Sequence, residues 1–267
     1  MSNEPSSAAQ LFSVTGKKVV ITGGSRGIGL MIARGFVAAG ADVLISARKV
    51  DQLAIAAEEL AAIDGGGSVH TVAADVASAA GAAALAEQVM AWSSVVNVLV
   101  NNAGATWGAP LEDFPEEGFD KVLDTNVKGP FYLTSSLLPA LRAAASSEDP
   151  ARVINIGSVD GLRPPMLDSF PYSASKAAVH QLTHHLARRL AGEHIPVNAI
   201  APGPFESKMM AFALGDPGTK SAIEKSVPLG RIGRADDMAG AAIFLASRAG
   251  AYLTGTIIPV DGGIVGA

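Results

Sequence analysis

Two ionisable side chains, Tyr172 and Lys176, stand four residues apart at the start of an expected helix over 172–191. Residues at that spacing lie on one face of a helix, one turn from each other. A phenol has an ordinary pKa of about 10, so it exchanges protons near neutral pH only if positive charge lies nearby. A Tyr/Lys pair also occurs as an ordinary surface contact, so its chemistry depends on residues elsewhere in the chain.

A glycine-rich segment, Thr22-Gly-Gly-Ser-Arg-Gly-Ile-Gly29, joins an expected strand to an expected helix. Glycines alone also serve tight turns. In the order strand, loop and helix, however, they allow the backbone to approach a pyrophosphate at the helix N-terminus. The segment therefore predicts a dinucleotide site, with contacts from Gly23, Ser25, Arg26, Gly27, Ile28 and Gly29.

The residues after the second expected strand indicate which dinucleotide binds. NAD sites often have an acidic residue there for the adenosine ribose, but this chain reads Ser46-Ala-Arg-Lys49. Arg48, with Arg26 and the neighbouring Lys49, offers positive groups that match the oxygens of a 2′-phosphate. We therefore expect NADP(H) rather than NAD(H). The alternative is that Arg48 and Lys49 only end a strand in solvent.

Short apolar runs bounded by turn residues predict buried strands at 18–22, 42–46, 68–72, 96–100, 152–156, 196–200 and 256–260. Longer Ala- and Leu-rich segments predict helices near 28–39, 50–62, 79–92, 118–145, 172–191 and 235–247. Strands that alternate with helices require crossover connections, which place helices on both faces of a parallel sheet. The expected fold is α/β: a single-domain, doubly wound Rossmann fold with a mainly parallel seven-stranded sheet.

We expect one domain over residues 13–267, preceded by a flexible N-terminal extension over 1–12. The first residues are polar, and no long Pro- or Ser-rich linker divides the chain. The least regular stretch, about 203–227, combines Pro and Gly with the apolar residues Met209, Met210, Phe212 and Leu214. A long loop with apolar residues of its own is a candidate substrate lid.

The composition excludes several classes of function. Hydrophobic residues make up 49% of the 267 and charged residues 17%, which is typical of a packed globular protein. A net charge of −5 with scattered Lys and Arg argues against nucleic acid or an anionic membrane as the main partner. The absence of cysteine excludes disulfides and thiolate chemistry. Without an export signal or an apolar run of ~20 residues, we expect a cytoplasmic protein.

Further polar motifs follow the expected strands. Asn101-Asn-Ala-Gly104 follows the fourth, Ser158 follows the fifth in Ile-Gly-Ser-Val, and Asn126 lies in Asp-Thr-Asn-Val. With the glycine segment and Tyr172-Ser-Ala-Ser-Lys176, this order resembles the classical short-chain dehydrogenase/reductases, over nearly the whole chain. Within that family the sequence looks most like bacterial NADPH-dependent β-ketoacyl reductases of the rhamnolipid-type branch, through 101–108, 151–158 and 202–203.

The resemblance implies direct hydride transfer between nicotinamide and a substrate carbon, with no metal. It makes Tyr172 the general acid for ketone reduction, its pKa lowered by Lys176 and the oxidised nicotinamide. Lys176 is also expected to bond the nicotinamide ribose, and Ser158 the substrate oxygen. Asn126 is expected to distort its helix and to hold a water that leads protons towards Lys176.

The same resemblance assigns further cofactor contacts. It places Asp75 and Val76 at the adenine, and Asn102 and Gly104 beside the cofactor. Ser207 stands where the family commonly has a threonine that contacts the carboxamide. The segment that contains it contributes Pro202, Gly203, Phe205 and Ser207 to the expected cofactor site, with Pro204 as a stiffening residue.

Two other kinds of site are weaker interpretations. His180 and His184 share a helix face at a spacing that suits two metal ligands, but no carboxylate completes a site. Ser158 lacks the glycine-flanked turn of a hydrolase nucleophile, and no histidine can be assigned as its base.

The leading hypothesis is thus an NADPH-dependent reduction of a ketone to a secondary alcohol, with a 3-oxoacyl compound as the candidate substrate. Trp107, Met166 and Leu167, with the lid residues, are candidates for an apolar pocket, although core packing is an equal alternative. The competing hypotheses are a reversible NAD(P)-dependent dehydrogenase of secondary or cyclic alcohols and a non-catalytic NADP-binding sensor. The family likeness also implies a homotetramer or homodimer, formed through the helices near 118–145 and 172–191.

Overall fold

A single parallel sheet of seven strands organises the computed structural model, which describes residues 6–165, 167–206 and 216–266. The strand order is β3-β2-β1-β4-β5-β6-β7. The strands are β1 Lys18–Thr22, β2 Asp42–Ala47, β3 Val69–Ala73, β4 Val98–Asn101, β5 Arg152–Ile156, β6 Val197–Pro202 and β7 Ile257–Val260. Each lies within two residues of its predicted bounds, so the predicted doubly wound α/β sheet is confirmed.

The central strands are continuous apolar runs because helices cover both of their faces. In β1, Val19, Val20 and Ile21 are all fully buried although their side chains alternate between the faces. The register aligns Val19 with Val43 of β2 on one side and with Val98 of β4 on the other. This central position fixes the level at which β1 ends and the glycine segment begins.

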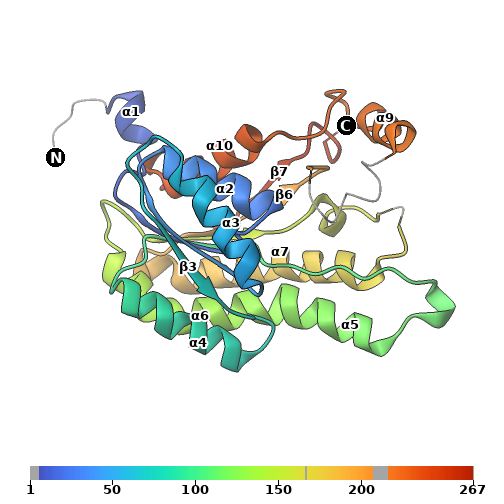
Figure 1. Ribbon diagram of the computed structural model, residues 1–267, viewed down its shortest axis with the longest axis horizontal. Coiled ribbons are helices and arrows are strands. Elements are labelled where there is room, and N and C mark those ends of the chain that lie inside the picture. The colour runs from blue at the N-terminus through green and yellow to red at the C-terminus, as the bar shows by residue number, and fades with distance from the viewer. Residues whose placement is uncertain (1–5, 166, 207–215, 267) are drawn as a thin grey trace.

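Helices lie on both faces of the sheet, as Figure 1 shows. One layer contains α2 (Gly27–Ala38), α3 (Val50–Ala61) and α10 (Ala235–Ala246), and its core includes Phe36, Leu53 and Met238. The other contains α4 (Ala79–Trp92), α6 (Gly129–Ala144) and α7 (Phe170–Leu190), with a core that includes Leu85, Leu137 and Leu190. The remaining α-helices among the described residues are α1 (Ala8–Leu11), α5 (Glu116–Leu123) and α9 (Pro217–Ser226).

Three features differ from the sequence prediction. The helix predicted over 118–145 is α5 and α6 joined by a π-helical segment, Asp124–Lys128, which is the helix distortion at Asn126 that the family resemblance implied. Residues 217–226 form α9 inside the stretch predicted to be irregular, because Asp216 caps the helix by accepting a hydrogen bond from the Thr219 amide. Within the expected flexible extension, Ser7 and Gln10 close a reciprocal cap around α1.

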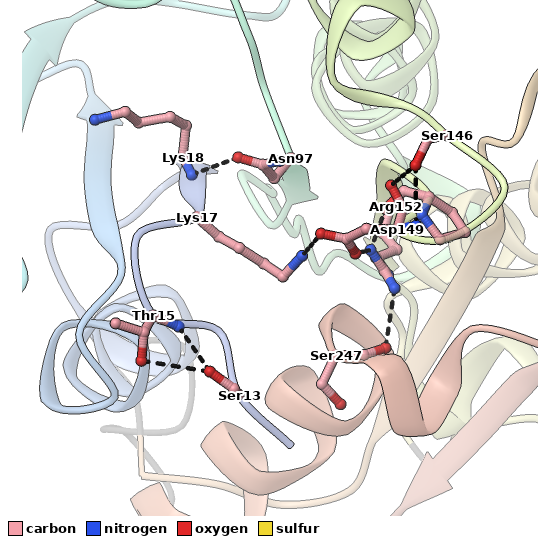
Figure 2. A network of polar contacts seen from close by, with 10 residues as sticks. Ser13, Thr15, Lys17, Lys18, Asn97, Ser146, Asp149, Arg152 and Ser247 are labelled. Atoms are coloured by element: carbon pink, nitrogen blue, oxygen red, sulfur yellow. Dashed lines mark hydrogen bonds and ion pairs between the residues drawn. The ribbon is translucent and has the colours of Figure 1, made fainter. Parts of the chain in front are cut away.

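An ion network that joins two buried cations to the half-exposed Asp149 holds the end of the sheet where the strands begin (Figure 2). Arg152, the first residue of β5, is 1% exposed and bonds Asp149, the Pro150 carbonyl and the Ser247 carbonyl. Asp149 also accepts a 2.5 Å bond from Lys17. Burial opposes ionisation of Asp149, but the bonds from Lys17 and Arg152 hold the pKa of its carboxyl below the usual value. This network is structural, since it lies at the opposite end of the strands from the predicted site residues.

The strand order reverses between β1 and β4, which are neighbours in the sheet but far apart in sequence. Crossovers on either side of such a point run in opposite directions and leave a crevice outside the carboxyl ends of the strands. The glycine segment follows β1 and the motif at 101–104 begins at the end of β4. The topology therefore places two of the predicted cofactor motifs at the point where ligands bind in open α/β sheets.

Candidate active site at the carboxyl edge of the sheet

The glycine segment is tied to both neighbouring strands. The Gly24 amide donates to the Ser46 carbonyl at the end of β2, over 3.2 Å. On the other side, the Asn102 amide nitrogen donates to the carbonyls of Thr22 (2.8 Å) and Gly23 (3.1 Å). The Asn102 side chain is therefore occupied in holding the loop in place.

Two glycines of the segment are required by its shape. Gly23 has a φ of +65°, which side chains disfavour. A Cβ on Gly29 would collide with the Gly23 carbonyl and the Asn102 amide, so α2 can approach the strand ends only with glycine there. The N-terminus of α2, where Arg26 is the capping residue, has no side-chain cap. Its amides are thus available for an anion, as a pyrophosphate site requires.

Positively charged residues follow both β1 and β2 at the carboxyl edge of the sheet. Arg26 and Arg48 are exposed, and Lys49 begins α3 as its capping residue. Arg48 approaches Asp75, which follows β3, with 3.8 Å between its guanidinium and the carboxylate. Both partners are more than half exposed, so this contact is weak and leaves Arg48 free to turn to a ligand. Val76, next to Asp75, is buried.

Ser158, Tyr172 and Lys176 come together where β5 ends against α7. Ser158 is 6% exposed and accepts a 3.1 Å hydrogen bond from the Asp160 amide. The Lys176 ammonium donates 2.7 Å to the Ile156 carbonyl and lies 5.5 Å from the centre of the Tyr172 ring. A hydrogen bond between the side chains of Tyr172 and Ser158 favours the ionised phenol. Ser158, which follows β5, thus shares one site with Tyr172 and Lys176, which lie one turn apart on α7.

The pKa values of the two ionisable groups are moved by burial. Burial raises the pKa of the Tyr172 phenol to about 12. The hydrogen bond with Ser158 lowers this pKa, and the negative charge of Asp160 raises it. Burial lowers the pKa of the Lys176 ammonium to about 8. The expectation that Lys176 and the oxidised nicotinamide lower the phenol pKa concerns the complex with cofactor and stays a prediction, because in the protein alone burial of the phenol outweighs the hydrogen bond with Ser158.

Asn126 is held in the middle of the π-helical segment, 1% exposed. Its oxygen accepts 2.7 Å from the Ala105 amide, while its nitrogen donates 2.9 Å both to the Ala105 carbonyl and to the Ser175 hydroxyl. A Cβ on Gly104 would lie 3.4 Å from the Asn126 oxygen and 3.9 Å from the Lys176 ammonium. Asn126 therefore joins the chain after β4 to α7, beside Lys176.

Sequence reasoning missed Ser175, which connects these groups. Its hydroxyl accepts from Asn126 and donates 2.7 Å to the Tyr172 carbonyl. It also missed a buried chain of hydrogen bonds behind the site, in which Asn101 bonds Asn155 (2.9 Å) and Asn155 bonds Thr183 of α7 (2.9 Å). Asparagines inside otherwise apolar strands were the available signal, since a buried amide requires a partner.

The segment after β6 contributes less than expected in the described part of the chain. Pro202 ends the strand, and Gly203 packs so closely on Asp261 that a Cβ would lie 2.8 Å from the Asp261 Cα. The Phe205 ring lies in the core against Gly233. Several expected residues lie outside the described residues: Met166, Ser207, Met209, Met210, Phe212 and Leu214.

An apolar hollow of about 300 Å³ lies between the segment after β4 and the start of α7, lined by Leu111, Phe114, Pro115, Glu116, Phe119, Asp120 and Phe170. Of the predicted pocket residues, Trp107 packs on α5, where a Cβ on Gly118 would lie 2.7 Å from the indole and Lys121 lies over the ring at 5.1 Å. Leu167 is 60% exposed.

The weaker interpretations also have definite positions. His180 is buried and His184 is exposed on the next turn of α7. In the described parts of the chain, no three His, Cys, Asp or Glu residues are grouped as metal ligands. None of the described helices combines the length and apolarity that a bilayer span requires.

Comparison with known proteins agrees with this arrangement. Residues 23–265 match a short-chain dehydrogenase/reductase family model described as "Enoyl-(Acyl carrier protein) reductase". The rhamnolipids biosynthesis 3-oxoacyl-[acyl-carrier-protein] reductase of Pseudomonas aeruginosa is 49% identical over 252 residues, which cover 94% of this chain and 97% of the relative.

Two solved structures extend the comparison. The Pseudomonas aeruginosa RhlG/NADP active-site complex has a TM-score of 0.92 at 48% identity and covers 96% of this chain and 99% of its own. A gluconate 5-dehydrogenase from Burkholderia cenocepacia, solved with NADP and tartrate, has a TM-score of 0.88 at 33% identity, with 98% and 100% covered.

Proposed function

This chain belongs to the short-chain dehydrogenase/reductase family, and on that premise we propose that it reduces a 3-oxoacyl group to the 3-hydroxyacyl product with NADPH. The observation that carries the proposal is the meeting of Ser158, Tyr172 and Lys176 at the same sheet edge as the glycine segment. A hydride donor bound along that segment and a proton donor from α7 can then act on one carbonyl.

The chain uses NADP(H), and its own residues fit that cofactor. The uncapped N-terminus of α2 and the absence of a Cβ at Gly29 leave room and amides for the pyrophosphate. No carboxylate stands directly after β2, and the exposed Arg26 and Arg48 supply charge for the 2′-phosphate. Asp75, Val76, Asn102 and Gly104 line the remaining path along the strand ends.

When bound, NADPH supplies the hydride for the ketone carbon. Ser158 donates a hydrogen bond to the ketone oxygen as negative charge develops there, and Tyr172 transfers its phenolic proton to that oxygen. A phenol with a pKa of about 12 keeps its proton at neutral pH, which suits the acid needed for reduction. Lys176 stabilises the Tyr172 phenolate that forms. Asn126 positions the chain beside Lys176, where the phenolate regains its proton.

The substrate assignment rests on the reductase relative, whose identity extends over almost the whole chain. The apolar hollow near the start of α7 and the apolar residues of 203–227 support an aliphatic substrate. A dehydrogenase of sugar acids is the second candidate, because the gluconate 5-dehydrogenase structure aligns over 98% of this chain.

The proposal includes a homotetramer or homodimer in the cytoplasm. Phe131 and Tyr132 of α6 are 44% and 37% exposed and lie against each other, and exposed aromatics of this kind are suited to contact with a second copy. Light scattering tests this part: a mass of one chain, 27.1 kDa, would contradict it.

A substrate panel tests the function. The purified protein is given NADPH or NADH with acetoacetyl and longer 3-oxoacyl thioesters, 5-ketogluconate and cyclic ketones, and loss of reduced nicotinamide is followed. We expect the highest kcat/KM with NADPH and a 3-oxoacyl thioester. Preference for 5-ketogluconate or cyclic ketones would replace the substrate assignment. Tight NADPH binding without turnover of any ketone would support a non-catalytic binding protein.

A further inference from the structure

His180 lies directly beneath the chain that carries Ser158. It stands on α7 one turn after Lys176, on the same face, and is 5% exposed. A Cβ on Gly157 would collide with the imidazole Nε2 and would lie 2.7 Å from its Cδ2. A Cβ on Gly161 would lie 2.9 Å from its Cε1. The ring thus fills a notch between two glycines, one on each side of Ser158.

The imidazole is held by packing rather than by hydrogen bonds. Within the described chain neither ring nitrogen has a hydrogen-bonding partner. Burial, with a smaller contribution from the Lys176 charge, lowers the pKa of His180 to about 4, although the nearby Gly161 backbone favours the charged ring. The ring is therefore neutral at physiological pH. An unpaired buried polar group costs free energy, so an aliphatic side chain would be the more stable choice for filling this space.

The two glycines also set how closely the Ser158 turn approaches α7. A Cβ on Gly161 would lie 2.6 Å from the Lys176 carbonyl carbon and 2.7 Å from the Ala177 amide nitrogen. Immediately before Gly157, the Ile156 carbonyl accepts the hydrogen bond from Lys176. Any shift of the chain over the ring therefore moves both the Ser158 hydroxyl and the acceptor that holds Lys176.

We propose that His180 is a positioning residue: its ring, seated between Gly157 and Gly161, fixes the Ser158 hydroxyl and the Ile156 carbonyl relative to Tyr172 and Lys176. This rests on the proposed function for its catalytic consequence. The packing relationship itself is independent of the substrate.

A double-mutant cycle tests the proposal, with the variants His180→Ala, Gly157→Ala and the combination. His180→Ala is expected to lower kcat by about 10- to 100-fold, with smaller changes in the ketone KM and the NADPH Kd, because displaced catalytic groups affect the chemical step most. Gly157→Ala alone should be worse, since its methyl group meets the ring. The double variant should recover kcat relative to Gly157→Ala, because the ring that obstructs the methyl group is gone.

Two further variants complete the test. His180→Leu, of similar volume, should restore most of the kcat lost in His180→Ala, and His184→Ala, exposed on the next turn, should retain wild-type kcat. An unchanged kcat in His180→Ala, or a double variant no better than Gly157→Ala, would overturn the proposal.

The free energy of unfolding provides a reading that needs no turnover. The effects of Gly157→Ala and His180→Ala should be strongly non-additive, with the second relieving the first. If the wild type reduced no ketone, the proposed function would fail, whereas additive unfolding energies would overturn the His180 packing itself. The two failures are thus distinguishable.

Discussion

The Lys176 ammonium donates a 2.7 Å hydrogen bond to the Ile156 carbonyl, so one side chain joins α7 to the end of β5. The same ammonium lies 5.5 Å from the centre of the Tyr172 ring. Its charge is therefore held where a phenolate forms when Tyr172 gives up its proton. Burial lowers the pKa of Lys176 to about 8, which places the loss of that charge within an accessible pH range.

The pH dependence of reduction follows from this lowered pKa. A lysine is charged below its pKa, so kcat for ketone reduction should be highest below about pH 8 and decline above it. Arginine stays charged at alkaline pH, so the kcat of Lys176→Arg should not decline above pH 8. We expect this kcat to be lower than that of the wild type at neutral pH, because the guanidinium differs in shape from the ammonium. The measurement is kcat against pH for both proteins, with the exposed Lys128→Arg as the control. An alkaline decline that persists in Lys176→Arg would show that another group is responsible.

Selectivity for NADPH should depend on Arg48 and Arg26. Removing a charged hydrogen-bonding partner of the 2′-phosphate costs about 1.5–3 kcal/mol, so Arg48→Ala should raise the NADPH KM by about 10- to 100-fold. The KM for NADH should hardly change, because NADH lacks that phosphate. Arg34→Ala, an exposed residue of α2 that pairs with Glu59, is the matched control. If both cofactors are weakened equally in Arg48→Ala, its role is structural.

The importance of the Asn126 contact can be tested through Ser175. Ser175→Ala removes both the acceptor for Asn126 and the bond to the Tyr172 carbonyl. We expect kcat to fall about 10-fold with little change in the NADPH Kd, since catalytic groups are displaced while the glycine segment is untouched. Ser173→Ala is the control, because its hydroxyl bonds only the Phe170 carbonyl among the described residues. Equal kcat values in Ser175→Ala and Ser173→Ala would show that Ser175 does not position the catalytic groups.

The ion network at the other end of the sheet should affect stability alone. Asp149→Ala leaves Arg152 buried without its carboxylate and should cost about 2 kcal/mol of unfolding free energy at neutral pH. Because the pKa of Asp149 is lowered in the folded chain, its contribution is present above the ordinary value of about 3.9 and is lost as pH falls through the lowered one.

Denaturant unfolding of Asp149→Ala, with the neighbouring Glu148→Ala as the control, measures this contribution. The difference between Asp149→Ala and the wild type should shrink in acid, while kcat of the folded variant stays unchanged. A neutral-pH stability equal to that of Glu148→Ala would show that solvent replaces the carboxylate around Arg152.

The periodic parts of the fold were predictable from the sequence. Runs such as 18–22 and 42–46 are mainly apolar because they are buried on both faces, and the glycine segment follows the first of them in a recognisable order. Local chemistry also placed Tyr172 and Lys176 on one helix face. These features depend on neighbours in sequence, which a single chain reveals.

The remaining features depend on contacts between distant segments. The π-helical turn at Asn126 arises where its amide bonds Ala105 and Ser175, neither of which is near it in sequence. His180 shares its helix face with His184, yet one is buried under Gly157 and the other is exposed. The burial that raises the pKa of the Tyr172 phenol in the protein alone was hidden for the same reason, since desolvation depends on contacts between segments that are distant in sequence.

The central claim is that the Tyr172 phenol gives the proton that accompanies hydride transfer. Its most direct test is single-turnover reduction of a 3-oxoacyl thioester by enzyme-bound NADPH, comparing wild type with Tyr172→Phe. Loss of a general acid should slow the step by about 100- to 10,000-fold while the NADPH Kd stays the same. Turnover by Tyr172→Phe at the wild-type rate would contradict the account and would assign the proton to another group.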